Sequence, residues 1–253
     1  MRCLFLLACL LLSCTQTSAV GSETEDTQFS VPSVMSVGLP DAQSKNQRRK
    51  AVERIANSSL AINLIAKDKE GRTRIATIGS AIAVKYGRHN LVITARHVAV
   101  SDSDPRLLFA CSVKSHDCVS LEPNLVMELQ LLPDISKDWA VYKTEVFPKG
   151  TIPTQISTEP LKLGDPVWLS GMPWGHHPWV NLGNIAWIFN ETGKVQVLGI
   201  NGFAASGSSG GGVYDEKGFL VGITVAVEIS PYAGPQENQV LAVPIRNIWV
   251  LNP

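Results

Sequence analysis

The sequence predicts an all-β barrel or sandwich. From Ser59 onward, short apolar and β-branched runs are separated by turn residues, which gives about nine candidate strands over roughly 190 residues. The strand–helix alternation that is typical of parallel sheets is missing from this region. The 253-residue chain is 45% hydrophobic and 17% charged, a composition that excludes an intrinsically disordered chain.

Turn signals divide the predicted strands. Gly71, 87–90 and 215–218 supply hairpin turns, and the proline-punctuated segment 145–160 separates two comparable groups of strands. The predicted strands are Ala61–Ala66, Arg74–Lys85, Asn90–Thr94, Leu107–Val113, Trp139–Thr144, Pro166–Ser170, Lys194–Ile200, Phe219–Val227 and Gln239–Val243.

The N-terminus carries an export signal. The apolar run 3–12 would be about 15 Å long as a helix, too short to cross a bilayer but typical of a signal peptide. Two cleavage sites compete. A lipobox-like site gives a signal peptide over 1–13 and a lipidated Cys14, whereas ordinary signal peptidase would cleave after Ala19. Either predicts an exported protein, which in a bacterium is periplasmic or a membrane-anchored lipoprotein and otherwise is secreted.

A flexible tether is predicted over 14–50, because polar and chain-breaking residues dominate it, although 47–57 carries a short helical pattern. The folded domain is predicted over 51–253.

The 22 basic and 22 acidic residues cancel, so no nucleic-acid partner is expected. Membrane contact is expected only through the possible lipid anchor, and the sequence leaves the oligomeric state open.

Cys111 and Cys118 enclose a short polar loop between predicted strands. In an oxidising compartment they are candidates for a disulfide, the alternative being two reduced thiols. A zinc site is disfavoured, since only His116 lies nearby. Neighbouring His176 and His177 cannot easily face one ion and are interpreted as a loop. No metal and no cofactor are therefore expected.

Three segments carry residues suited to nucleophilic catalysis. His97 ends an apolar strand, Asp138 opens another, and Ser209 lies in a glycine-rich turn. A serine hydroxyl becomes a good nucleophile when an imidazole takes its proton and a carboxylate orients that imidazole. Glycines beside the serine let backbone N–H groups converge on an oxyanion. Each residue alone has an ordinary structural explanation, but together they predict a catalytic triad.

Chain order separates the folds that use such a triad. The segment 207–211 fits the G-x-S-x-G elbow of α/β-hydrolases, but that fold needs a histidine after the serine and all five histidines precede Ser209. Subtilisin order would place the acid before the histidine. The order His97, Asp138, Ser209 is that of chymotrypsin-like double barrels.

These motifs resemble the trypsin-like serine protease superfamily, most closely its bacterial high-temperature-requirement (Deg-type) branch. The matching segments are 79–82, 94–97, 134–141, 169–175, 207–211, 219–223 and 241–245. The resemblance implies two antiparallel six-stranded β-barrels, over about 59–150 and about 160–250, with the active site between them. No PDZ domain is expected after these segments.

The resemblance also implies roles for individual residues. Ser209 would be the nucleophile, His97 the general base and then acid, and Asp138 the orienting carboxylate. The backbone N–H groups of Gly207 and Ser209 would form the oxyanion hole. The implied activity is a serine endopeptidase that cleaves a protein or peptide substrate through an acyl-enzyme. The alternatives are a catalytically silent protease-fold binding or adaptor protein, and an esterase or other acyl transferase.

A primary specificity pocket follows from the same resemblance. Phe203 falls at the position of the pocket base, and Thr224, Val225, Ala226 and Val227 would form one wall. Because no acidic residue lies there, small or medium apolar side chains are the expected specificity.

Overall fold

The computed structural model describes residues 42–67, 69–99, 107–121, 125–126, 137–175, 178–191, 194–230 and 234–248. The expected signal peptide, Cys14 and the His176–His177 pair lie outside these ranges. No helix within them is long and apolar enough to cross a membrane.

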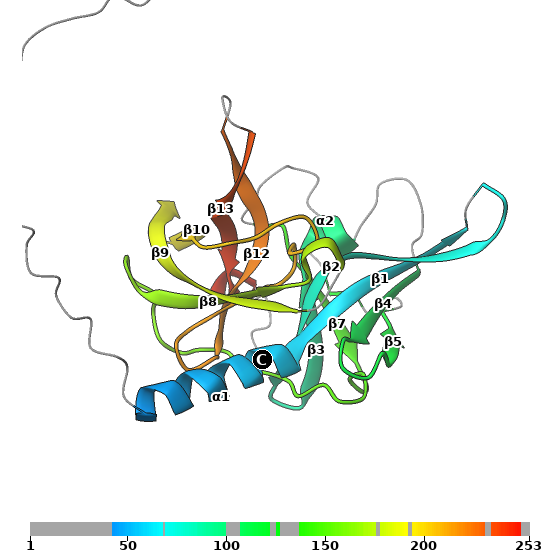
Figure 1. The fold of residues 1–253 in the computed structure, drawn as a ribbon, viewed down its shortest axis with the longest axis horizontal. Coiled ribbons are helices and arrows are strands. Elements are labelled where there is room, and N and C mark those ends of the chain that lie inside the picture. Colours follow the sequence, from blue (N-terminus) through cyan, green and yellow to red (C-terminus); the bar gives the residue numbers. More distant parts are fainter. Residues whose placement is uncertain are drawn as a thin grey trace, which may run out of the picture. The chain divides into compact units, whose positions relative to one another are not determined.

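The strands form two antiparallel systems that lie side by side (Figure 1). Barrel one is a seven-stranded sheet in the order β5-β4-β1-β2-β3-β7-β6, and barrel two is a closed barrel in the order β10-β13-β12-β11-β8-β9. The strands of barrel one are β1 (Ser59–Lys67), β2 (Thr73–Tyr86), β3 (His89–Thr94), β4 (Leu107–Ser112), β5 (Cys118–Ser120), β6 (Leu125–Val126) and β7 (Ala140–Thr144). Those of barrel two are β8 (Pro166–Gly171), β9 (Trp179–Glu191), β10 (Lys194–Asn201), β11 (Gly212–Tyr214), β12 (Leu220–Ser230) and β13 (Gly234–Pro244).

The predicted all-β double barrel is confirmed, with one difference in strand number. Within the described residues, barrel one has seven strands instead of six, and the short β5 and β6 lie at the two ends of its sheet. The larger apolar core joins side chains of barrel one to Tyr214, Ile223 and Val225 of barrel two, and a smaller core lies inside barrel two. Ile62, Ile82 and Ile93 are fully buried in barrel one, and Leu198 and Val213 are almost fully buried in barrel two.

The helix α1 (Ala42–Ser58) runs directly into β1 (Figure 1). The helical pattern predicted from residue 47 is present, but the helix begins five residues earlier, inside the segment interpreted as a tether. Ala51 and Ile55, spaced four apart, bury one face of the helix. Arg54 stacks on the Phe219 ring at 4.7 Å, which fastens the exposed side of α1 to barrel two.

The segment 151–157 connects the two barrels and is hydrogen-bonded to both. Thr154 exchanges two backbone hydrogen bonds with β2, at 2.9 and 3.2 Å. Leu220 at the start of β12 exchanges two more with the same segment, at 2.8 and 2.9 Å. The connection therefore behaves as an added strand piece between the barrels.

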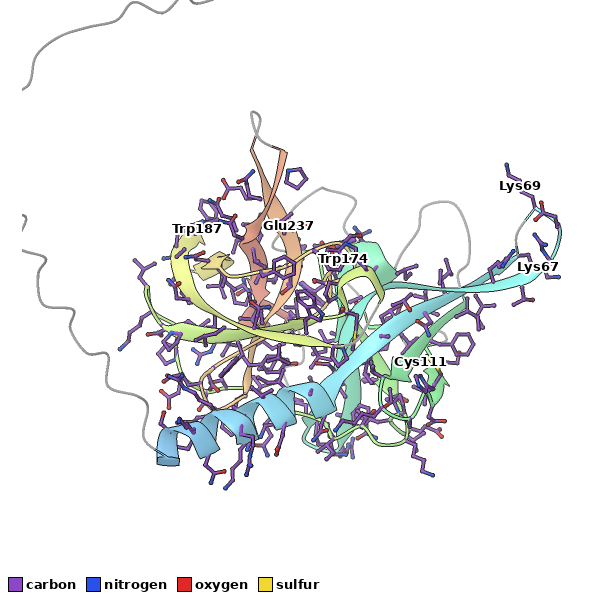
Figure 2. The ribbon with its side chains drawn as sticks, in the orientation of Figure 1. Lys67, Lys69, Cys111, Trp174, Trp187 and Glu237 are labelled. Carbon is purple, nitrogen blue, oxygen red and sulfur yellow. A yellow bond between two sulfur atoms is a disulfide. The ribbon has the colours of Figure 1, made fainter. Side chains whose placement is uncertain are left out.

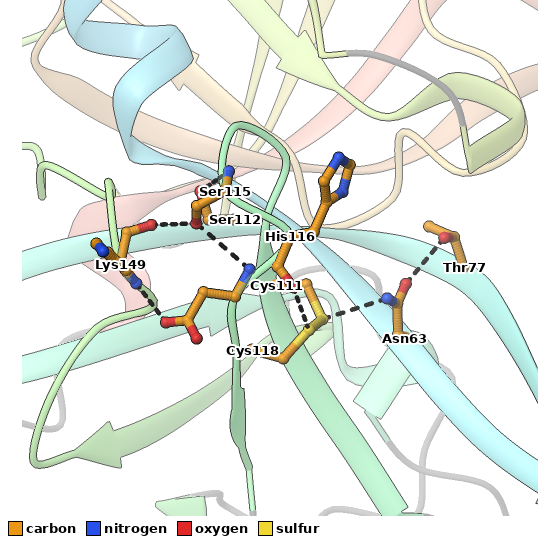
Figure 3. The surroundings of a disulfide bond; sticks show 9 residues. Asn63, Thr77, Cys111, Ser112, Ser115, His116, Cys118 and Lys149 are labelled. Carbon is orange, nitrogen blue, oxygen red and sulfur yellow. Dashed lines mark hydrogen bonds between the residues drawn. A yellow bond between two sulfur atoms is a disulfide. The ribbon is translucent and has the colours of Figure 1, made fainter.

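Cys111 and Cys118 form the predicted disulfide, with an S–S distance of 2.07 Å (Figure 3). The two residues are directly paired across β4 and β5, so the bond closes a short hairpin. Asn63 in β1 donates its amide to Cys111 Sγ at 3.2 Å and accepts a hydrogen bond from Thr77 Oγ1 at 2.8 Å. The hairpin is therefore tied to the centre of barrel one.

Candidate active site

His97 and Asp138 meet at one end of barrel one. His97 lies in α2 (Arg96–Ala99), the single helical turn that follows β3, and Asp138 lies two residues before β7, the neighbour of β3. Asp138 Oδ2 lies 2.7 Å from His97 Nδ1, and Asp138 Oδ1 accepts the His97 backbone N–H at 2.9 Å. One carboxylate thus holds both the ring and the backbone of the histidine.

This geometry selects one form of the imidazole. An ionised carboxylate only accepts hydrogen bonds, so the proton lies on Nδ1 of His97 and Nε2 is left as an acceptor. The Asp138 side chain is 21% exposed, whereas the His97 side chain is 50% exposed. The histidine can therefore reach a reacting group while its partner stays largely covered.

Ser209 belongs to the loop that connects β10 to β11 (residues 202–211), which we call the nucleophile loop after the role predicted for Ser209. This loop comes from barrel two but is bonded to barrel one. The Ser209 carbonyl accepts the backbone N–H of Ser80 in β2 at 2.8 Å. Ser80 Oγ donates to the Gly207 carbonyl at 2.7 Å and accepts the Met172 N–H at 2.8 Å. A single side chain of β2 therefore joins two segments of barrel two.

Gly210 packs tightly against barrel one. A Cβ at this position would lie 2.1 Å from the Ser80 carbonyl oxygen and 2.2 Å from Thr94 Oγ1. Its φ of +85° is also a conformation that favours glycine. Only glycine lets the loop pack against the ends of β2 and β3, where His97 follows.

The two amides predicted to bind an oxyanion are Gly207 N and Ser209 N. Within the described residues, neither of these N–H groups has a hydrogen-bond acceptor. Around them the loop is closed by turns, with Ser208 N donating to the Ala205 carbonyl and Gly211 N donating to the Ser208 carbonyl, both at 2.9 Å. Their donor capacity is thus free for a ligand oxygen.

The predicted triad also requires a contact between Ser209 Oγ and His97 Nε2, and among the described residues no hydrogen bond joins these two atoms. Catalytic hydrogen bonds often shorten only when a substrate is bound. The structure therefore brings His97 and Asp138 into contact and places the nucleophile loop against the same end of barrel one.

A cavity of about 120 Å³ lies beside Ser209. Small side chains and backbone line it, and none of the lining residues is charged: they are Ala204, Ala205, Ser206, Ser208, Ser209, Thr224, Ala226 and Val227. The predicted wall residues Thr224, Ala226 and Val227 are among them. Val225 is not, because it is only 2% exposed and packs into the core at an irregularity in the β12–β13 register.

Phe203, predicted as the base of this pocket, does not line the cavity either. Its ring packs against Trp179, with centroids 5.2 Å apart, and lies 6.3 Å from Trp174. Trp174 and Trp179 are 54% and 44% exposed, so both rings lie at the surface of barrel two.

Two buried tyrosine hydroxyl groups, Tyr142 in barrel one and Tyr214 in barrel two, have raised pKa values. Burial raises the pKa of the Tyr142 hydroxyl to about 12. Burial also raises the pKa of Tyr214, although hydrogen bonds from Ser170, Ser58 and Ser59 act in the opposite direction. Elsewhere, the described residues hold no cluster of three or more His, Cys, Asp or Glu side chains that could bind a metal ion.

A double β-barrel with a histidine–carboxylate pair at one end of barrel one, and with a glycine-rich serine loop packed against the same end, defines a chymotrypsin-like architecture. The trypsin-like peptidase domain family matches residues 79–223, more than half of the chain. The chain therefore belongs to the trypsin-like peptidase domain family. No curated protein sequence matches it.

Solved structures share this fold at low sequence identity. The HtrA-type protease AlgW with a decapeptide is 20% identical, with a TM-score of 0.60 over 79% of this chain and 64% of that one. The Rv3671c protease from M. tuberculosis in its active form is 18% identical, with a TM-score of 0.57 over 83% of this chain and 85% of that one. The chain thus spans less than two thirds of the HtrA-type proteases that it matches.

Proposed function

We propose that the chain is an exported serine endopeptidase whose catalytic triad is Ser209, His97 and Asp138. The observation that carries this proposal is the carboxylate of Asp138 bonded to both the ring and the backbone of His97, at 2.7 and 2.9 Å. The nucleophile loop, fixed against the same end of barrel one, supplies the serine. Membership of a peptidase family supports the reaction class.

In the proposed reaction, Ser209 Oγ attacks the carbonyl carbon of a peptide bond and His97 Nε2 takes the hydroxyl proton. The carbonyl oxygen becomes an oxyanion that accepts hydrogen bonds from Gly207 N–H and Ser209 N–H. His97 then gives its proton to the leaving amine, which forms the acyl-enzyme. Water, deprotonated by His97, releases the acid and restores Ser209.

The proposed specificity follows from the cavity beside Ser209. Its volume of about 120 Å³ and its uncharged walls fit a small apolar side chain on the acyl side of the cleaved bond. A lysine or arginine at that position would find no carboxylate partner among the residues that line the cavity.

The deciding experiment is labelling with a fluorophosphonate, which reacts with an activated serine. We expect the wild-type protein to be labelled at Ser209, and Ser209→Ala to lose labelling and peptidase activity by on the order of 10⁴-fold or more. Ser206→Ala is the matched control for labelling, because Ser206 is exposed in the same loop, and this variant should be labelled within a few-fold of wild type. Full peptidase activity in Ser209→Ala would refute the proposal.

A second candidate function is a catalytically silent adaptor with a protease fold. The observation that favours it is the missing hydrogen bond between Ser209 Oγ and His97 Nε2 within the described residues. Absence of labelling in a folded wild-type protein, with a peptide still bound, would favour this candidate.

Export and lipidation belong to the proposal as well. They rest on the apolar run 3–12 and on Cys14, and the disulfide between Cys111 and Cys118 is consistent with an oxidising compartment. Mass spectrometry of the mature N-terminus separates a lipidated Cys14 from cleavage after Ala19.

A further inference from the structure

Trp174, Trp179 and Phe203 form a group of touching rings on the surface of barrel two, which we call the aromatic cluster. The ring centroids are 5.9 Å apart for the two tryptophans, 5.2 Å for Trp179 and Phe203, and 6.3 Å for Trp174 and Phe203. About half of each tryptophan faces solvent. Exposed apolar surface of this kind is stabilised when a ligand covers it.

The cluster is held in place by the backbone beneath it. Asn181 donates its side-chain amide to the Phe203 carbonyl and accepts the Phe203 N–H, both at 3.1 Å. Trp174 has a φ of +56°, which is costly for any residue except glycine, and its N–H donates to the Ser206 carbonyl at 2.7 Å. A site whose rings are already ordered loses little conformational entropy when it binds a ligand.

The cluster also adjoins the cavity beside Ser209. Ser206, which bonds Trp174, lines that cavity, and so do Ala204 and Ala205, which follow Phe203 directly. The turn from Ala205 to Ser208 keeps its ends within about 7 Å of each other. A Cβ at Gly207, two residues before Ser209, would lie 3.1 Å from the Trp174 nitrogen. Because an extended peptide advances about 3.3 Å per residue, a peptide joined to Ser209 reaches the Trp174 backbone within about three residues.

We propose that the aromatic cluster is a second specificity subsite, which binds a large apolar side chain of the peptide substrate within about three residues of the cleaved bond. The inference rests on the proposed peptidase function. The proposed subsite differs from the primary pocket because it binds a large side chain. The rings offer an open apolar face, whereas the primary pocket offers a small enclosed space.

The test uses a hexapeptide of alanine and its six versions with a single phenylalanine. Cleavage is followed by mass spectrometry, and binding is followed by tryptophan fluorescence in Ser209→Ala, which does not need turnover. We expect one or two of the phenylalanine peptides to be cleaved about tenfold more efficiently than the all-alanine peptide and to bind correspondingly tighter.

Trp179→Ala and Phe203→Ala should abolish this preference, so that the phenylalanine peptides are cleaved and bound no better than the all-alanine peptide. Trp179→Phe should keep most of it. Trp187→Ala is the matched control, since Trp187 lies on the same strand with 40% exposure and Figure 2 shows it well apart from Trp174. This control should keep the preference.

Equal loss for phenylalanine and all-alanine peptides in Trp179→Ala and Phe203→Ala would mean a merely structural role and would overturn the inference. So would a preference that persists in these variants, or one absent from the wild-type protein. If wild type resists fluorophosphonate, the proposed function fails, and the binding measurement still decides whether the cluster takes the phenylalanine side chain.

Discussion

Replacing Gly210 with alanine tests whether the nucleophile loop is fixed by its contact with barrel one. Two penalties act at this position. The φ of +85° costs an L-residue roughly 1–2 kcal/mol. In addition, the new methyl group would lie 2.1 Å from the Ser80 carbonyl oxygen and 2.9 Å from the Ala95 nitrogen, so backbone must move. Overpacking of this kind adds about 1–3 kcal/mol or more.

Gly164→Ala is the matched control because it isolates the first penalty. Gly164 has a φ of +84°, but a Cβ there would meet nothing within 4 Å. We therefore expect Gly164→Ala to lower the free energy of unfolding by about 1–2 kcal/mol and Gly210→Ala by about 2–5 kcal/mol. Both values come from urea unfolding followed by circular dichroism.

The same displacement should reach the active site. The Ser209 carbonyl would lose its 2.8 Å bond to Ser80 N, and a shift of about 1 Å in a reacting group can cost about 100-fold in rate. Fluorophosphonate labelling of folded Gly210→Ala should fall by about that factor, while Gly164→Ala should match wild type.

If Gly210→Ala does not fold, Thr94→Val is the milder variant. It removes only the 2.6 Å bond from Thr94 Oγ1 to the Ser80 carbonyl and should cost about 1–3 kcal/mol. The reasoning is wrong if Gly210→Ala and Gly164→Ala unfold alike and are labelled alike, or, should Gly210→Ala not fold, if Thr94→Val matches wild type in both measurements.

Three further predictions concern other parts of the molecule. Asp138→Asn should slow labelling by on the order of 10⁴-fold with unchanged circular dichroism, because an amide has one acceptor oxygen for the two N–H groups of His97; labelling within tenfold of wild type would contradict this. Replacing Cys111 and Cys118 with serine should lower the free energy of unfolding by about 2.5 kcal/mol for so short a loop, while labelling stays constant. Stability should also fall as the pH rises from 10 toward 12, since the unfolded chain ionises Tyr142 near 10 and the folded chain near 12. In urea titrations at pH 8 to 11, Tyr142→Phe should show a smaller decline than wild type, and an identical decline would exclude this contribution.

The sequence predicted those strands whose run of apolar residues matches their buried position in the folded protein. The long apolar runs became β2, β3 and β12, since burial on both sides leaves few alternatives to a strand. It missed β9 entirely. That strand combines Asn181, Gly183 and Asn184 with exposed Leu182 and Phe189, so neither composition nor alternation marks it.

The candidate site divides in the same way. His97, Asp138 and Ser209 follow from chemistry and chain order, and the structure joins the first two directly, whereas the role of Ser209 stays a prediction. The residues that line the pocket depend on the pairing register of the strands, which the sequence alone does not reveal. Irregular pairing along β12 turns Val225 into the core, and the asparagine side chain at 181 holds Phe203 among exposed rings.

The hydrogen-bonded connection 151–157 has a consequence for how a substrate enters. Rotation of one barrel away from the other would break either the two backbone hydrogen bonds between Thr154 and β2 or the two between the connection and Leu220. Each broken hydrogen bond would cost about 1 kcal/mol, and more where the N–H donor is left without a water or protein acceptor. Wide opening of the barrels would therefore be a rare fluctuation. We therefore expect peptides to bind without hinge closure. Association rate constants should be set by collisions between the peptide and a site of constant width. Raising the solvent viscosity should then slow association only as far as it slows diffusion of the peptide.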